Sequence, residues 1–166
     1  MDHLVIFALE SGIPFTAFML ESFASAIWQI YPPFPSLTVD DFIPSIDRLF
    51  HKIDARNEKI FQQARSVCVS CDGWVCNRDV CSSWIRITAK IASRDQIVDV
   101  SAHGLKNDPS RKDVIEAHLL KAIERIGQDC VAGIVTNDWE SMISAVASIR
   151  ENHYPALQTY PCIANT

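Results

Sequence analysis

The segment SVCVSCDGW, residues 66–74, contains the most informative pattern in this chain. Its apolar run Val67–Cys71 is short, rich in valine and followed by Asp-Gly, which predicts a strand buried on both faces. A second apolar run, Cys130–Thr136, is followed by the dipeptide Asn-Asp. We therefore expect two neighbouring strands that each end in a carboxylate, Asp72 on the first and Asp138 on the second.

The segments between and after these two runs predict the rest of a sheet. Residues 84–91 and 97–102 alternate apolar and polar side chains, which predicts two antiparallel strands with one face in contact with water. Apolar residues at helical spacing predict helices over 114–126 and 142–149, and residues 157–163 predict a last strand. Three antiparallel strands, a right-handed crossover and a parallel partner form the mixed α/β sheet of ribonuclease H-like folds.

This order of elements brings the two carboxylates together. We predict that Val67–Cys71 is central in the sheet and pairs in parallel with Val131–Val135. Asp72 and Asp138 then lie near one another as the candidate catalytic and metal-binding residues. Two-metal phosphoryl transfer needs carboxylates that bridge two divalent ions about 3.5–4 Å apart, and hard oxygen ligands suit Mg²⁺ or Mn²⁺.

Residues 1–65 have a different pattern, and we place a domain boundary between this helical N-terminal segment and residues 66–166. Apolar residues recur at helical spacing over residues 15–30, and the proline-rich YPPFPS ends that helix. A second helix begins between Thr38 and Pro44. Its apolar residues are Ile46, Leu49, Phe50, Ile53 and Ile60. We expect both helices to form a covering layer whose apolar faces pack in a core.

Composition limits the classes of function. The 166 residues are 48% hydrophobic and carry a formal net charge of -5, so the chain can bury one core plus an appendage. The acidic balance argues against a free-standing, nonspecific DNA-binding protein, because phosphate neutralisation needs clustered Lys and Arg. We therefore expect any DNA binding to be weak.

The ends and cysteines of the chain bear on its location. The N-terminal stretch contains Asp2 and Glu10 and no basic leader, so it does not resemble a secretory signal. No run approaches the ~20 apolar residues of a membrane helix. We expect an intracellular protein with reduced cysteines. Cys68 and Cys71 have the spacing of zinc ligands, but on a strand they point to opposite faces, which favours buried thiols over zinc.

Other interpretations of the polar residues compete with a metal site. Asp72 before a glycine also suits a turn at a strand end. Asp138 suits the N-cap of the helix that follows, and we favour this cap over a metal ligand. His103, His118 and His153 are scattered without ligand spacing, so we do not expect them to bind a metal.

Several segments together resemble a known family. The segments SGIPF, CDGW, HGLKNDPSRKDVIEAHLLKAIERIG, VTND and YPCIAN resemble, in this order and spacing, the N-terminal part of the catalytic region of hAT-superfamily transposases. The resemblance covers nearly the whole chain. It implies a ribonuclease H-like fold, DNA strand cleavage and transfer with Mg²⁺ or Mn²⁺, and a nuclear location.

The resemblance also assigns individual residues. Asp72 matches the family's first catalytic acid, and Trp74 matches the aromatic residue that follows it. Asn137 stands in the place of the second acid, with Asp138 one position later. This order leaves Asp72 and Asp138 as vestigial candidates for catalysis.

The last motif departs from the family as well. Cys162 matches the family's cysteine, but Asn165 stands where a histidine is expected. We therefore expect a transposon-derived, inactive domain that needs no cofactor and acts as a protein or nucleic-acid interaction module. An uncovered sheet face would bind a protein partner or a second copy of the chain. The alternative is the front fragment of an active hAT-type transposase, whose third acid lies outside this chain.

Overall fold

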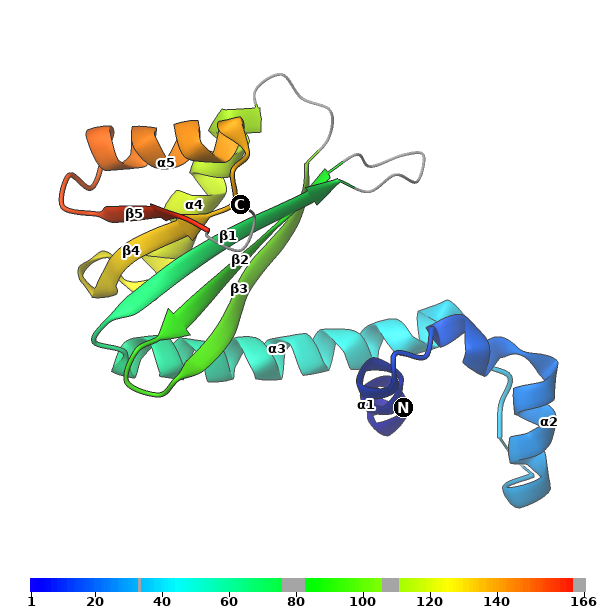
Figure 1. Cartoon of the computed structure of the whole chain (residues 1–166). Helices are drawn as coiled ribbons and strands as arrows, with labels where there is room; N and C mark the ends of the chain where they lie inside the picture. The colour runs from blue at the N-terminus through cyan, green and yellow to red at the C-terminus, as the bar shows by residue number, and fades with distance from the viewer. Residues whose placement is uncertain (33, 76–82, 106–110, 163–166) are drawn as a thin grey trace. The chain divides into compact units, whose positions relative to one another are not determined.

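The computed structural model describes residues 1–32, 34–75, 83–105 and 111–162 (Figure 1). The chain divides into two compact units, Met1–Arg56 and Asn57–Thr166. The division falls within one long helix, α3 (Val39–Gln63), whereas the sequence places the boundary where that helix has ended. Within the described residues, no helix is long and apolar enough to cross a membrane.

The second unit is built on a five-stranded mixed sheet. Its strands are β1 (Val67–Val75), β2 (Ser83–Ile91), β3 (Gln96–Leu105), β4 (Val131–Thr136) and β5 (Gln158–Pro161). The strand order is β3-β2-β1-β4-β5, with β1, β2 and β3 antiparallel and β4 and β5 parallel to β1. The predicted pairing is confirmed, because Val67 pairs with Val131 and Cys71 with Thr136. This is the α/β, ribonuclease H-like sheet that the sequence predicts, preceded by a helical segment.

Both later helices cover the same face of this sheet. α4 (Arg111–Ile126) contacts β2 and β3, α5 (Glu140–Asn152) contacts β4, and the two helices contact each other (Figure 1). The alternation of β2 is confirmed. Its buried side chains are Ser83, Ile85, Ile87, Ala89 and Ile91. The layer between sheet and helices is therefore the core of this unit.

The opposite side of the sheet is called the open face below. Its side chains on the two central strands are Cys68, Ser70, Asp72 and Trp74 of β1, and Trp84, Arg86, Thr88 and Lys90 of β2. The prediction that Val67–Cys71 is buried on both faces is therefore wrong. Val67, Val69 and Cys71 are fully buried, but Cys68 and Ser70 are only half-buried, because α4 and α5 lie on one face.

The first unit has its own small aromatic core. Its elements are α1 (Asp2–Ser11), the 3-10 helix η1 (Phe15–Met19), α2 (Glu21–Ile30) and the first part of α3. Its buried apolar residues are Val5, Ala8, Phe18, Leu37 and Phe42. The single helix predicted over residues 15–30 is wrong. Leu20 has an extended backbone, with φ -69° and ψ 137°, and separates η1 from α2.

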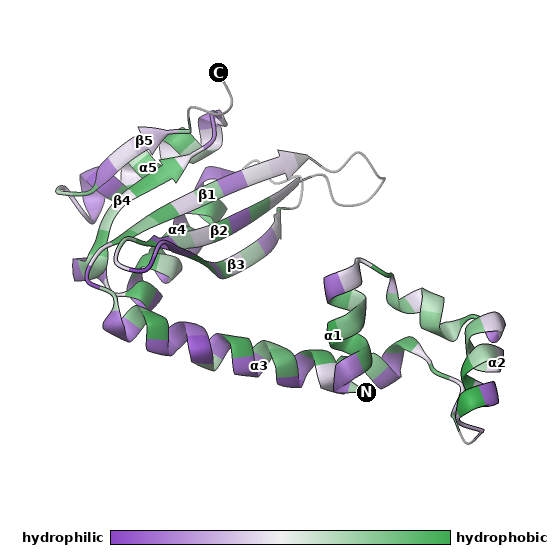
Figure 2. Cartoon of the chain, turned by 60° about the horizontal axis from the view of Figure 1, so that its bottom comes forward, coloured by the Kyte–Doolittle hydropathy of each residue, from purple (hydrophilic) through white to green (hydrophobic). Residues whose placement is uncertain are grey.

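The helix α3 begins where the sequence predicts. The backbone N–H and the hydroxyl of Thr38 both donate to Asp41 Oδ2, at 2.7 and 2.8 Å, and this local bonding fixes the start of the helix. Figure 2 shows apolar residues recurring along α3 between hydrophilic ones.

The apolar residues of α3 do not all pack in a core. Phe42 is buried, and Leu49 packs against the same cluster. Val39, in the first turn, is 53% exposed, and four apolar residues further along the helix are exposed by 36% to 62%. These four residues, called the α3 stripe below, are Ile43, Ile46, Phe50 and Ile53. The prediction that Ile46, Phe50 and Ile53 are core residues is therefore wrong, because the side of this part of α3 that packs in the core is the adjoining one, which carries Phe42, Ser45 and Leu49.

Candidate functional site

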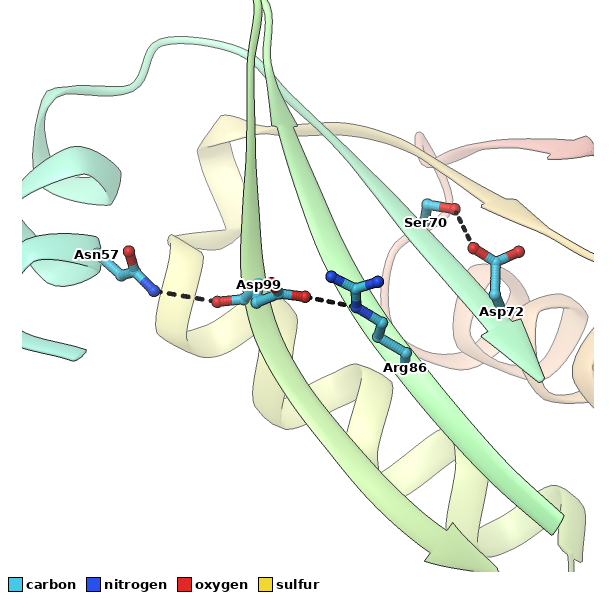
Figure 3. A network of polar contacts seen from close by, with 5 residues as sticks. All are labelled: Asn57, Ser70, Asp72, Arg86 and Asp99. Carbon is cyan, nitrogen blue, oxygen red and sulfur yellow. Dashed lines mark hydrogen bonds and ion pairs between the residues drawn. The ribbon is translucent and has the colours of Figure 1, made fainter. Parts of the chain in front are cut away.

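Asp72 lies on the open face, within β1 and not at its end. β1 continues to Val75, so the predicted strand end is wrong. The side chain of Asp72 is exposed, and the hydroxyl of Ser70 donates to its Oδ2 at 3.5 Å (Figure 3). The residue directly opposite on β2 is Arg86. The first candidate acid therefore faces a guanidinium across the strand pair.

Arg86 is the centre of a polar network over three strands. Its Nε donates to Asp99 Oδ1 at 2.6 Å, and the amide of Asn57 donates to the backbone oxygen of Asp99 at 3.1 Å (Figure 3). The hydrogen bond from Arg86 to Asp99 raises the pKa of Arg86 above its usual value, and the charge of Asp72 adds to this effect. Positive charge beside Asp72 opposes the binding of divalent cations there.

Asn137, which the sequence resemblance aligns with a second acid, is only 5% exposed. Its Nδ2 donates to the backbone oxygen of Gly73 at 3.0 Å, and its Oδ1 accepts from the backbone N–H of Trp139 at 3.4 Å. The side chain thus joins the end of β4 to β1 and to the start of α5. We call Gly73, Asn137 and Trp139 the Asn137 bridge. An ionised aspartate has no donor for the oxygen of Gly73, whereas the amide of Asn137 can both donate and accept.

Gly73 completes this bridge by its lack of a side chain. A Cβ on Gly73 would lie 2.7 Å from Met142 Cε and 2.7 and 2.9 Å from two ring carbons of Trp139. Met142 is fully buried in the core. The Asp-Gly pair therefore does not mark the end of a strand. Its glycine lets the first turn of α5 pack directly on β1.

Asp138 is exposed and lies in a bend between β4 and α5. The N-cap of α5 is Trp139, and no side chain caps this helix, so the predicted cap by Asp138 is wrong. The side chain of Asn137, the residue before Asp138, accepts the N–H of Trp139 instead. In the part of the chain that the structure describes, no group of three or more His, Cys, Asp or Glu side chains is arranged to hold a metal ion.

Cys68 and Cys71 lie on opposite faces of β1, and only Cys71 packs in the core. Cys71 is fully buried, and burial raises the pKa of its thiol to about 12, with a further contribution from the charge of Asp72. A thiol that resists ionisation is a poor zinc ligand. Cys68 lies on the open face and Cys71 in the core, as the alternation along the strand predicts.

The other residues that carry the sequence resemblance are Cys162, Trp74 and Asn165. The backbone N–H of Cys162 donates to the oxygen of Thr136 at 2.7 Å, which extends the pairing of β4 with β5. Trp74 is 45% exposed on the open face. Asn165 lies outside the described residues.

The structure brings together two histidines that the sequence treats as scattered. The rings of His103 on β3 and His118 on α4 stack, with centroids 3.5 Å apart and planes 19° apart. Burial lowers the pKa of both imidazoles. The sequence pattern places both histidines toward the core side of their elements. His103 lies between exposed residues of β3, and His118 is next to the buried Leu119 of α4.

Comparison with known proteins adds no family. No family model matches this chain, and no curated protein matches it. The fold defines the class as an α/β protein with a ribonuclease H-like sheet. The residues present do not fit a two-metal site, because Asp72 lies opposite Arg86 and the side chain of Asn137 is an amide bonded to the backbone, whereas a two-metal site needs converging carboxylates.

Proposed function

We propose that this chain is a non-catalytic ribonuclease H-like domain of hAT-transposase descent, which acts as an interaction module. It associates through the α3 stripe with a second copy of itself. The observation that carries the proposal is the Asn137 bridge. In it, the residue at the position of the second acid bonds to β1 and to the start of α5.

The proposed loss of catalysis follows from the side chains that would have to bind the two metal ions. Two divalent ions need several carboxylates at one place to offset their charge. Asp72 has the guanidinium of Arg86 opposite it, and Asn137 turns its amide donor toward the oxygen of Gly73. Asp138 would have to replace the second acid from an exposed bend. The alternative, an active transposase fragment, requires acids supplied from outside this chain.

The α3 stripe supports the role in binding. Its four residues follow the spacing i, i+3, i+7 and i+10, which is the a and d pattern of a helix that packs against another helix. Their exposed fractions of 36% to 62% leave substantial apolar area in water. Burial of such side chains contributes about 1.5–3 kcal/mol each when complete. The stripe therefore leaves apolar surface that packing against a second helix would remove from water.

A second copy of the chain is the occupant that best fits this surface. A two-fold interface uses the same surface on both partners, so the α3 stripe of one copy meets an equally long apolar seam on the other. The open face is a weaker candidate, because charged pairs interrupt its apolar side chains Trp74 and Trp84. Arg86 pairs with Asp99, and Lys90 pairs with Asp95. These pairs also leave little free positive charge for the phosphates of DNA.

Substitution in the α3 stripe tests the proposal. We expect the wild-type chain to be a dimer at micromolar concentration, and Phe50→Glu with Ile53→Glu to make it a monomer, because both carboxylates would be buried in the helix pair. Size exclusion with light scattering measures the mass. Ala55→Glu is the matched control, since it adds a carboxylate to an exposed position of the same helix outside the stripe.

The outcomes separate the candidate partners. A wild-type monomer, or a dimer that persists in the double variant, would contradict association through the α3 stripe. Binding of a DNA strand with strong salt dependence, unchanged in the double variant, would point to nucleic acid instead.

A further inference from the structure

A cavity between β3 and α4 gathers four basic side chains, and the described residues pair only one of them with an acid. Its volume is about 230 Å³, and its polar lining residues are Ser101, His103, His118, Lys121 and Arg125. None of the described residues that line it is acidic. A cavity of this kind attracts anions.

Arg125 is the base in this cavity that forms an ion pair with an acid. Its Nε donates to Glu58 Oε1 at 2.6 Å, and its Nη1 donates to the backbone oxygen of Val100 at 3.0 Å. Its guanidinium carbon lies 5.8 Å from the centre of the Phe61 ring. The carboxylate that α3 supplies is thus taken up by Arg125. Arg125 therefore forms a fixed wall of the cavity.

The other three bases have no such partner among the residues that the structure describes. Among the described residues, Lys121 makes no ion pair with a carboxylate. Burial lowers the pKa of His103 and of His118, and the charge of Lys121 lowers both further. The stacked rings also oppose each other's protonation, since two cations 3.5 Å apart repel. The negative charge of an anion in the cavity would favour the protonated rings and so offset these penalties.

We propose that this cavity binds a phosphoryl-type oxyanion through Lys121, the two stacked histidines and the hydroxyl of Ser101. The ammonium group and the imidazolium N–H groups are charge-assisted donors, which suit the several oxygens of such an anion. The hydroxyl adds a neutral donor. The site is separate from the non-catalytic role proposed above and does not depend on it.

Binding should change the titration of the two histidines in a defined direction. Without an anion, their lowered pKa values mean that stability is complete above the ordinary pKa of about 6.5 and is lost as the pH falls below it. A bound anion favours the protonated rings, so it raises both pKa values and offsets this loss. Sulfate is a suitable probe for the pH series, because it keeps its charge throughout.

NMR titration of the histidine side chains tests the site. We expect sulfate and inorganic phosphate each to raise the pKa of His103 and His118, and to leave the exposed His153 unchanged. Lys121→Ala should weaken the binding at least about tenfold, the loss expected for one charged hydrogen bond. Lys112→Ala is the matched control on the same helix, because Lys112 lies outside the cavity and beside Glu116.

Two results would overturn the proposal. One is an equal response of His153 and the stacked pair, which would show general screening by salt. The other is binding that Lys121→Ala leaves unchanged while the circular dichroism of the variant stays that of the wild type. A further experiment adds a short single-stranded oligonucleotide as a competitor of bound phosphate. Displacement of phosphate by it identifies a nucleic-acid backbone as the source of the phosphoryl group, and no displacement identifies a free or monoester phosphate.

Discussion

Replacement of Asn137 by aspartate is expected to lower the free energy of unfolding by about 2–3 kcal/mol at pH 7. The Nδ2 of Asn137 donates to the oxygen of Gly73, and the side chain is buried. A carboxylate here loses this bond and places negative charge against a carbonyl oxygen. Urea denaturation followed by circular dichroism measures the change.

The pH dependence of this variant has a definite sign. Burial raises the pKa of the new carboxyl in the folded state, so the penalty is present at neutral pH. It should shrink as the pH falls toward about 4, where a protonated carboxyl can again donate to Gly73. Asp138→Asn is the control, since Asp138 is exposed. Equal stability of Asn137→Asp and Asp138→Asn would contradict the structural role of the Asn137 bridge.

Replacement of Gly73 by alanine is expected to cost about 1–3 kcal/mol, through overpacking. The new Cβ would meet Met142 Cε and the ring of Trp139 at 2.7 Å, so the side chains of Met142 and Trp139 would have to shift within the packed core. Thermal or urea unfolding measures the loss. It should exceed the cost of a typical exposed substitution, which is within about 0.5 kcal/mol.

A double-mutant cycle identifies the cause of this loss. Met142→Ala removes the methyl group that the new Cβ meets, so Gly73→Ala should cost less in the Met142→Ala background than in the wild type. Additive costs would mean that Met142 takes no part in the clash. The close packing of α5 on β1 at Gly73 would then need another explanation.

The sheet was predictable because its signals are local. The alternation of residues 84–91 and the apolar runs at Val67 and Val131 identify strands, and the chirality of crossovers then fixes their order. The start of α3 was predictable for the same reason, since Thr38 and Asp41 are close in sequence. Lengths were not, as the extension of β1 to Val75 shows.

The site was less predictable because its contacts join distant segments. Asn137 and Gly73 meet only through the register of β4 with β1, and the stack of His103 on His118 needs the packing of α4 on β3. The exposure of the α3 stripe was hard to predict for another reason. Periodicity identifies an apolar helix face, but it does not identify what covers that face.

Calorimetric titration of the wild-type chain with Mn²⁺ is the most direct test of the central claim, that the Asn137 bridge has replaced a metal site. A two-metal site needs converging carboxylates, whereas Asp72 lies opposite Arg86 and Asn137 is bonded to Gly73. We predict no saturable uptake of two ions per chain at neutral pH and low salt. Tight binding of two Mn²⁺ ions that is lost in Asp72→Asn would contradict the account.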